Sequence, residues 1–171
     1  MSRYLVAGTP LFLEVAIDGA RVRDRMDPAL AESIARLCDD AGAIAVPESC
    51  RSFMKELIER ASEADQPWYR LLTLHGDGAL VACVGFGQES GRNGVYHFYG
   101  AIAVTLEWLE RAGQAWRGWL AQASARQARV EIDARHDGVT GVFQRQFDPV
   151  ARIADFYDDG RDQLIFGWRP Q

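Results

Sequence analysis

The sequence predicts a mixed α/β fold built on a mostly antiparallel sheet. Residues 68–74, 79–86 and 95–104 are apolar segments separated by short glycine-containing turns, a pattern typical of an antiparallel meander. A helix is expected next, because apolar residues recur at three- and four-residue steps between 109 and 123. A further strand is expected over 129–134. A helix between two strands is the crossover that a parallel pair requires, so we expect one parallel pair in this sheet.

The remaining elements follow from local signals. Residues 11–17 and 20–25 flank the pair Asp18-Gly19, which suits the positive φ angles of a tight hairpin turn. Asp27 can cap a helix whose first turn accommodates Pro28, and an apolar stripe continues to residue 41. A second helix is expected over 49–61, a short helix over 140–146, and strands over 150–154 and 163–168.

Length and composition indicate one globular domain. The chain has 171 residues and no repeat or Pro/Gly-rich linker, so we expect a single domain over 1–171, with 1–19 as an N-terminal arm or extra strand. The net charge of −5 argues against nucleic acid as a partner. No apolar run reaches the roughly 20 residues of a membrane span, and no signal peptide is visible. The three cysteines lack CxxC spacing and suit a reducing compartment, so we expect a cytoplasmic protein.

The C-terminal third carries a more specific pattern. It contains Phe143-Gln144-Arg145-Gln146-Phe147, a short strand, Asp155-Phe156-Tyr157, a glycine- and aspartate-rich turn at 158–162, and an apolar last strand. This pattern resembles the GNAT acetyltransferase superfamily, in which a Phe-Tyr pair, a basic residue and Gly-Phe precede a strand, an aromatic-Tyr pair and a turn. The order of elements is also similar. The resemblance implies an acetyl-CoA-dependent N-acyltransferase acting on a small amine or amino-acid-like acceptor.

The same resemblance implies where acetyl-CoA would bind. The strand ending at 104 and the strand starting near 129 would splay apart, and the pantetheine arm would lie between them. It would hydrogen-bond to free backbone groups near Ile102, Ala103 and Val104, and the pyrophosphate would meet the N-terminus of the central helix. The segment nearest to the family's phosphate loop is Glu110-Arg111-Ala112-Gly113-Gln114-Ala115. Its candidate cofactor-binding residues are Arg111, Ala112, Gly113, Gln114 and Ala115.

The phosphate loop has a structural alternative. Its first position is Glu110, whose carboxylate would repel a pyrophosphate. Thr105 could instead cap a helix over 106–127, because the apolar stripe continues across Gly113. That helix would begin about two turns early and leave no loop. The sequence leaves both possibilities open.

The catalytic candidates are His97, Tyr99 and Tyr157. Gln144 stands where many family members have a tyrosine that protonates the leaving thiolate, so the acid and base must come from elsewhere. Strand alternation places His97 and Tyr99 on one face, and histidine titrates near neutral pH. A lone histidine in an aromatic strand is also commonly structural. Asp133, His136 and Asp137 match no metal motif, and no metal is expected.

Three functions therefore remain open. One is N-acyl transfer to a small-molecule amine. Another is a GNAT-fold protein without transferase activity that binds a ligand or a partner, which the changes at Glu110 and Gln144 favour. A third is a different reaction in the same cleft with His97 as base. Residues 43–49 and 89–94 are expected to be irregular acceptor-binding loops. The arm at 1–10 could cover the cleft or pair with another subunit, so a homodimer is one option.

Overall fold

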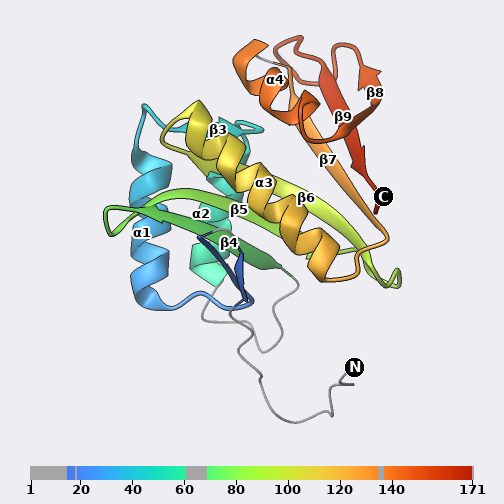
Figure 1. The fold of residues 1–171 in the computed structure, drawn as a ribbon. Coiled ribbons are helices and arrows are strands. Elements are labelled where there is room, and N and C mark those ends of the chain that lie inside the picture. The colour runs from blue at the N-terminus through green and yellow to red at the C-terminus, as the bar shows by residue number, and fades with distance from the viewer. Residues whose placement is uncertain (1–14, 18, 61–68, 135–136, 171) are drawn as a thin grey trace.

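The computed structural model describes residues 15–17, 19–60, 69–134 and 137–170. Within these residues, nine strands form one sheet and four helices cover it (Figure 1). The strands are β1 (Val15–Ile17), β2 (Ala20–Arg23), β3 (Ile44–Val46), β4 (Arg70–Gly76), β5 (Ala79–Gln88), β6 (Val95–Ala103), β7 (Gln127–Asp133), β8 (Asp148–Ile153) and β9 (Gln163–Trp168). The helices are α1 (Pro28–Asp39), α2 (Cys50–Arg60), α3 (Leu106–Gln122) and α4 (Asp137–Gln144).

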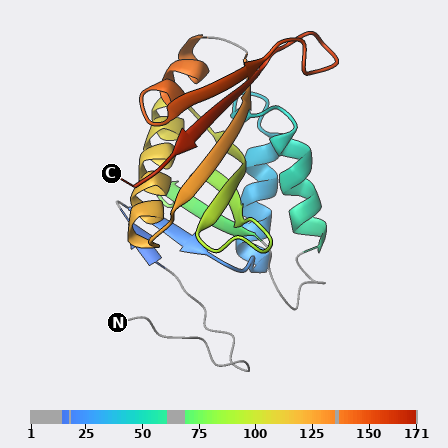
Figure 2. The same ribbon diagram turned by 90° about the vertical axis from the view of Figure 1, so that its right-hand side faces the viewer.

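The sheet lies between two helical layers. Its strand order is β1-β2-β4-β5-β6-β7-β9-β8, with β3 paired to β6 outside this path. Figure 2 shows α3 and α4 on one face and α1 and α2 on the other. Each face has its own apolar core, because side chains of successive strand residues point to opposite faces. Phe86, Trp116 and Phe166 are buried on the α3 face, and Ile34 and Met54 are buried on the other.

The predicted mixed sheet is confirmed. All pairings are antiparallel except that of β6 with β7, which is parallel and is bridged by α3 as expected. The predicted start of α1 is also confirmed. The Asp27 side chain accepts a hydrogen bond from the Leu30 N–H at 2.8 Å, and Pro28 occupies the first helical position. The last strand, β9, has the bounds that were predicted.

The expected loop over 43–49 is wrong in its central part. Residues Ile44–Val46 form β3, which pairs with β6 antiparallel. Ala45 and Val46 are fully buried, so β3 is part of the core. Residues 1–10, the predicted arm, lie outside the described residues. None of the described helices is long and apolar enough to cross a membrane.

A bulge interrupts β6 at Tyr99. Gly85 on β5 pairs with Gly100, but the next residue, Phe86, pairs with Phe98, so Tyr99 has no register partner on β5. Gly100 has a φ of +148°, a conformation that L side chains rarely adopt. A Cβ atom there would lie 2.5 Å from Cys50 Sγ. A glycine is therefore required at this point both for backbone conformation and for packing against α2.

Gly100→Ala is expected to destabilise the protein by about 3 kcal/mol, because backbone strain and overpacking each cost about 1–3 kcal/mol. Gly91→Ala is the matched control, since Gly91 also has a positive φ but no atom lies within 4 Å of its added Cβ. It should cost only about 1 kcal/mol. Urea unfolding followed by circular dichroism measures both. Equal losses in the two variants would contradict the packing assigned to Cys50.

Candidate active site

The strands β6 and β7 diverge as the resemblance implies. They pair only through Val95 with Gln127, Tyr96 with Ala128, and His97 with Arg129. Beyond His97 the two strands no longer pair, and β7 continues beside β9 as far as Asp133. A splay therefore opens toward the carboxyl ends of β6 and β7, next to the start of α3 (Figure 1).

Beyond His97, β3 pairs with the edge of β6 that β7 no longer covers. The pairs are Ile44 with Ala103, Ala45 with Ile102, and Val46 with Ala101. The same three residues of β6 pair with β5 on their other edge. Residues 101–103 thus have a strand partner on both sides. In this conformation their backbone N–H and C=O groups are not open to a ligand in the splay.

The backbone groups of Ile102 and Val104 point away from the splay, contrary to the expected cofactor contacts. The Val104 N–H donates to the Val81 carbonyl of β5 at 3.0 Å, so the backbone of Val104 faces β5. Because backbone groups alternate between the two edges of a strand, Ile102 also faces β5. The expectation that Ile102 and Val104 present free groups to the splay is therefore wrong. Ala103 and Ala101 face the splay, and both lie opposite β3.

The central helix begins at Leu106. The Thr105 side chain accepts a hydrogen bond from the Trp108 N–H at 3.3 Å, and the Thr105 carbonyl accepts from the Leu109 N–H at 3.0 Å. The helix then runs without interruption through Gly113 to Gln122. Of the two possibilities that the sequence left open, the capped helix is the one observed, although it ends before residue 127. The phosphate loop expected at 110–115 is not formed.

The residues of that segment have other contacts. Ala112 and Ala115 are buried in the core beneath α3. The Arg111 guanidinium lies over the Trp108 ring, 4.3 Å from its centroid. Gln114 lines a shallow groove with Arg117, toward the C-terminal strand. The predicted cofactor-binding residues 111–115 are therefore spread around a helix, because successive helical residues point about 100° apart.

Glu110 is anchored to the segment after α4. Its carboxylate accepts two hydrogen bonds from the Arg145 guanidinium, from Nε and from Nη2, each at 3.0 Å. The hydrogen bond from Arg145 holds the pKa of Glu110 below its usual value. The Gln146 side-chain N–H donates to the Glu110 carbonyl at 3.0 Å. Gly113 lies against the same side chain, since an added Cβ would be 2.3 Å from Gln146 Oε1. The segment is thus a docking face for residues 145–146.

The catalytic candidates occupy different parts of the splay. His97 lies at its closed end, opposite Arg129, with Nε2 3.4 Å from a Glu89 carboxylate oxygen. Tyr99 lies at the bulge, where the splay has opened, and its ring centroid is 5.3 Å from that of Phe53. Burial raises the pKa of the Tyr99 hydroxyl. Tyr99 packs against the core on the α2 side of the sheet, whereas Tyr96 and Phe98 are buried in the core under α3.

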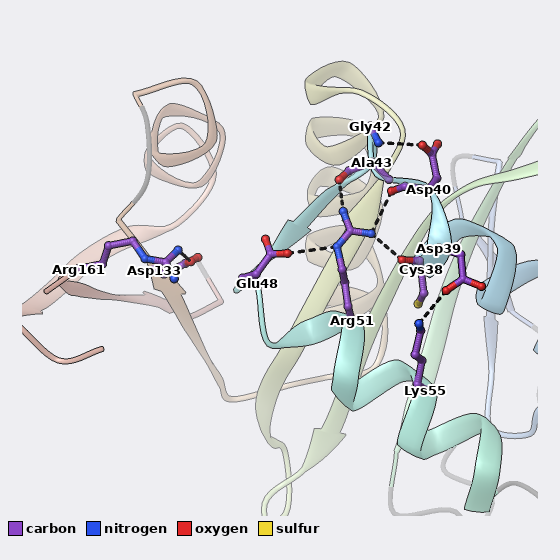
Figure 3. Close-up of polar contacts among 10 residues, drawn as sticks. All are labelled: Cys38, Asp39, Asp40, Gly42, Ala43, Glu48, Arg51, Lys55, Asp133 and Arg161. Atoms are coloured by element: carbon purple, nitrogen blue, oxygen red, sulfur yellow. Dashed lines mark hydrogen bonds and ion pairs between the residues drawn. The ribbon is translucent and has the colours of Figure 1, made fainter. Parts of the chain in front are cut away.

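Tyr157 belongs to a polar network on the neighbouring strands. Burial raises its pKa, and the nearby Asp133 and Glu131 carboxylates raise it further. Asp133 is fully buried and forms an ion pair with Arg161, the contact at the left of Figure 3. The Gln163 side chain donates to Glu131 at 2.8 Å. No local pattern in the sequence indicates this network, because its members come from β7, β9 and the turn between β8 and β9.

Gln144, which replaces the family's tyrosine, is exposed at the end of α4. Among the described residues, no group of three or more His, Cys, Asp or Glu side chains could hold a metal ion.

Several solved structures with a similar fold carry the name acetyltransferase. A protein from Desulfovibrio desulfuricans assigned to the GNAT family is 18% identical, with a TM-score of 0.69 over 88% of this chain and 98% of that one. The ribosomal L7/L12 α-N-protein acetyltransferase RimL, in complex with coenzyme A, is 8% identical, with a TM-score of 0.67 over 89% and 94%. The chain has the GNAT fold.

A third similar structure is the aminoglycoside 6′-N-acetyltransferase from Enterococcus faecium, at 9% identity and a TM-score of 0.63 over 85% of this chain and 94% of that one. No family model and no curated protein matches the sequence. The similarity to GNAT structures is thus one of fold, and the resemblance noted in residues 143–166 agrees with it.

The contact of Gly113 with Gln146 predicts that Gly113→Ala changes the stability of the protein in opposite directions with and without the Gln146 side chain. Gly113→Ala should destabilise the wild-type protein by about 1–2 kcal/mol through overpacking. In a Gln146→Ala background the obstructing side chain is gone, and the same substitution should stabilise by up to about 1 kcal/mol, because alanine is the better helix former. Thermal and urea unfolding of the four proteins measure this. The docking role of Gly113 is refuted if its substitution has the same effect in both backgrounds.

Proposed function

We propose that the protein is an acetyl-CoA-dependent N-acyltransferase that acts on a small amine or an amino-acid-like acceptor. The observation that carries this proposal is the divergence of β6 and β7 beyond His97, beside a bulge that carries Tyr99. Support comes from the fold, which is shared with N-acetyltransferases of a ribosomal protein and of aminoglycosides.

The side chains at the splay suit the proton transfers of this reaction. The attacking amine nitrogen must lose a proton as it bonds to the thioester carbonyl carbon, and the departing thiolate takes one up as the C–S bond breaks. His97 would accept the amine proton at Nδ1, the ring nitrogen that does not face Glu89. The Glu89 carboxylate would then stabilise the imidazolium that forms. Tyr99 is protonated at neutral pH, since burial raises its pKa, and would supply the proton to the thiolate.

A second candidate function has its own structural support. The segment expected to bind pyrophosphate is helical, and its Glu110 is engaged by Arg145. The first turns of α3 also carry Glu107, and a carboxylate near a helix N-terminus opposes binding of an anionic phosphate. These features favour a GNAT-fold protein that binds a ligand or a partner without acyl transfer. Binding of acetyl-CoA distinguishes the two candidates.

The proposed activity predicts that acetyl-CoA binds and that its thiol is released only when an amine acceptor is present. Calorimetric titration, with desulfo-CoA and ADP for comparison, measures binding, and a thiol-release assay with a panel of amines measures turnover. His97→Gln should lower kcat by about 10²-fold or more, as expected for the loss of a general base.

Arg60→Ala is the matched control, because Arg60 is an exposed residue of α2 paired with Glu56. Its kcat should equal that of the wild type. Absence of acetyl-CoA binding at millimolar concentration would reject the transferase and leave the second candidate.

A further inference from the structure

The connection between α1 and α2 enters the splay as a strand. Three residues, Ile44–Val46, pair with residues 101–103 of β6 and take the position that β7 would hold if the two strands ran together. Ala45 packs in the core under α1 and α2, whereas Val46 packs in the core under α3. The strand thus lies where the two apolar cores meet.

The side chain of Arg51 forms hydrogen bonds with the segments before and after this strand. The Arg51 guanidinium donates to the Cys38 carbonyl at 2.7 Å, to the Asp40 carbonyl at 3.0 Å and to the Ala43 carbonyl. Its Nε donates to the Glu48 carboxylate at 3.2 Å. We call these contacts the Arg51 network, which Figure 3 shows between the end of α1 and the first turn of α2.

The Arg51 network fixes both ends of the connection. Cys38 and Asp40 lie at the C-terminus of α1, where carbonyls have no partner within the helix. Ala43 immediately precedes β3, and Glu48 follows it. Because hydrogen bonds from a charged donor are about twice as strong as neutral ones, one guanidinium can hold a strand that has only three paired residues.

β3 pairs with the backbone groups of β6 that an extended ligand would need. A strand edge binds an extended, amide-bearing ligand through its outward backbone groups. On the splay side of β6, those groups belong to Ala101 and Ala103, which face Val46 and Ile44. The two amides of a pantetheine arm and the backbone of β3 would therefore compete for the same backbone groups of Ala101 and Ala103.

We propose that β3 is a displaceable strand that closes the acyl-CoA site, and that Arg51 is the positioning residue that keeps it closed. This inference rests on the proposed function. A ligand that binds only the open form has an apparent Kd equal to its intrinsic Kd divided by the open fraction. Weakening the Arg51 network should therefore tighten acetyl-CoA binding, and fixing β3 to β6 should prevent it.

The decisive experiment fixes β3 covalently. Ile44→Cys combined with Ala103→Cys places two thiols across an antiparallel pair whose Cα atoms are about 5.5 Å apart, within the range for a disulfide. Ile44 and Ala103 belong to the core under α3, whereas the native cysteines Cys38, Cys50 and Cys83 lie in the other core. Acetyl-CoA is titrated into the same variant, oxidised and then reduced. Oxidation should weaken binding by at least about 10-fold, with recovery on reduction.

Arg51→Leu gives the opposite perturbation, since it keeps the apolar stem but removes every donor. Its apparent Kd for acetyl-CoA should fall by about 10-fold relative to the wild type. Lys55→Met is the matched control, because it breaks the nearby exposed pair between Lys55 and Asp39 on the same helix without touching the Arg51 network. Its Kd should not change. Should Arg51→Leu fail to fold, the disulfide variant still decides the question.

The outcomes separate this inference from the proposed function. Equal acetyl-CoA affinity in the oxidised and reduced disulfide variant overturns the inference while acetyl-CoA binding itself stands. Absence of binding in the wild type, the reduced variant and Arg51→Leu alike overturns both, and the protein is then a GNAT-fold binder of another ligand.

Discussion

The site depends on how β6 satisfies the backbone groups on its two edges. Buried strand edges must find hydrogen-bond partners, because an unpaired buried N–H or C=O is costly. β6 has β5 along one edge, but β7 covers the other edge only as far as His97. Beyond that point β7 diverges from β6, and β3 pairs with the same edge instead. The opening is therefore closed in the described conformation.

The start of α3 adds a second constraint. A Thr105 cap lengthens the helix toward the splay and converts the expected phosphate loop into a regular helical surface. The polar and glycine residues of that surface then serve packing, since Glu110 and Gly113 receive Arg145 and Gln146 from the segment after α4. This arrangement ties α3 to the C-terminal strands. It also means that any anion at the helix N-terminus would meet Glu107 rather than a glycine-rich loop.

The sequence predicted those elements whose signals are local. The Asp27-Pro28 cap, the apolar stripes of the helices and the glycine turns of the meander all lie within short segments, and the structure agrees with them. β3 was missed because three residues are too few to show a period and their partner lies more than fifty residues away. The choice between loop and helix at 110–115 stayed open because both had local support, the helix from the Thr105 cap and the continuous apolar stripe, and the loop from a glycine in register.

Amide hydrogen exchange at β6, measured by NMR on the free protein, tests the central claim most directly. The account predicts that the N–H groups of Ala101 and Ala103, which face β3, exchange far more slowly than that of Gly91 in the exposed turn, but faster than that of Ile102, which faces β5, because β3 opens more often than β5. Exchange at Ala101 and Ala103 as fast as at Gly91 in the exposed turn, with Ile102 still protected, would show that the splay is open and would contradict the account.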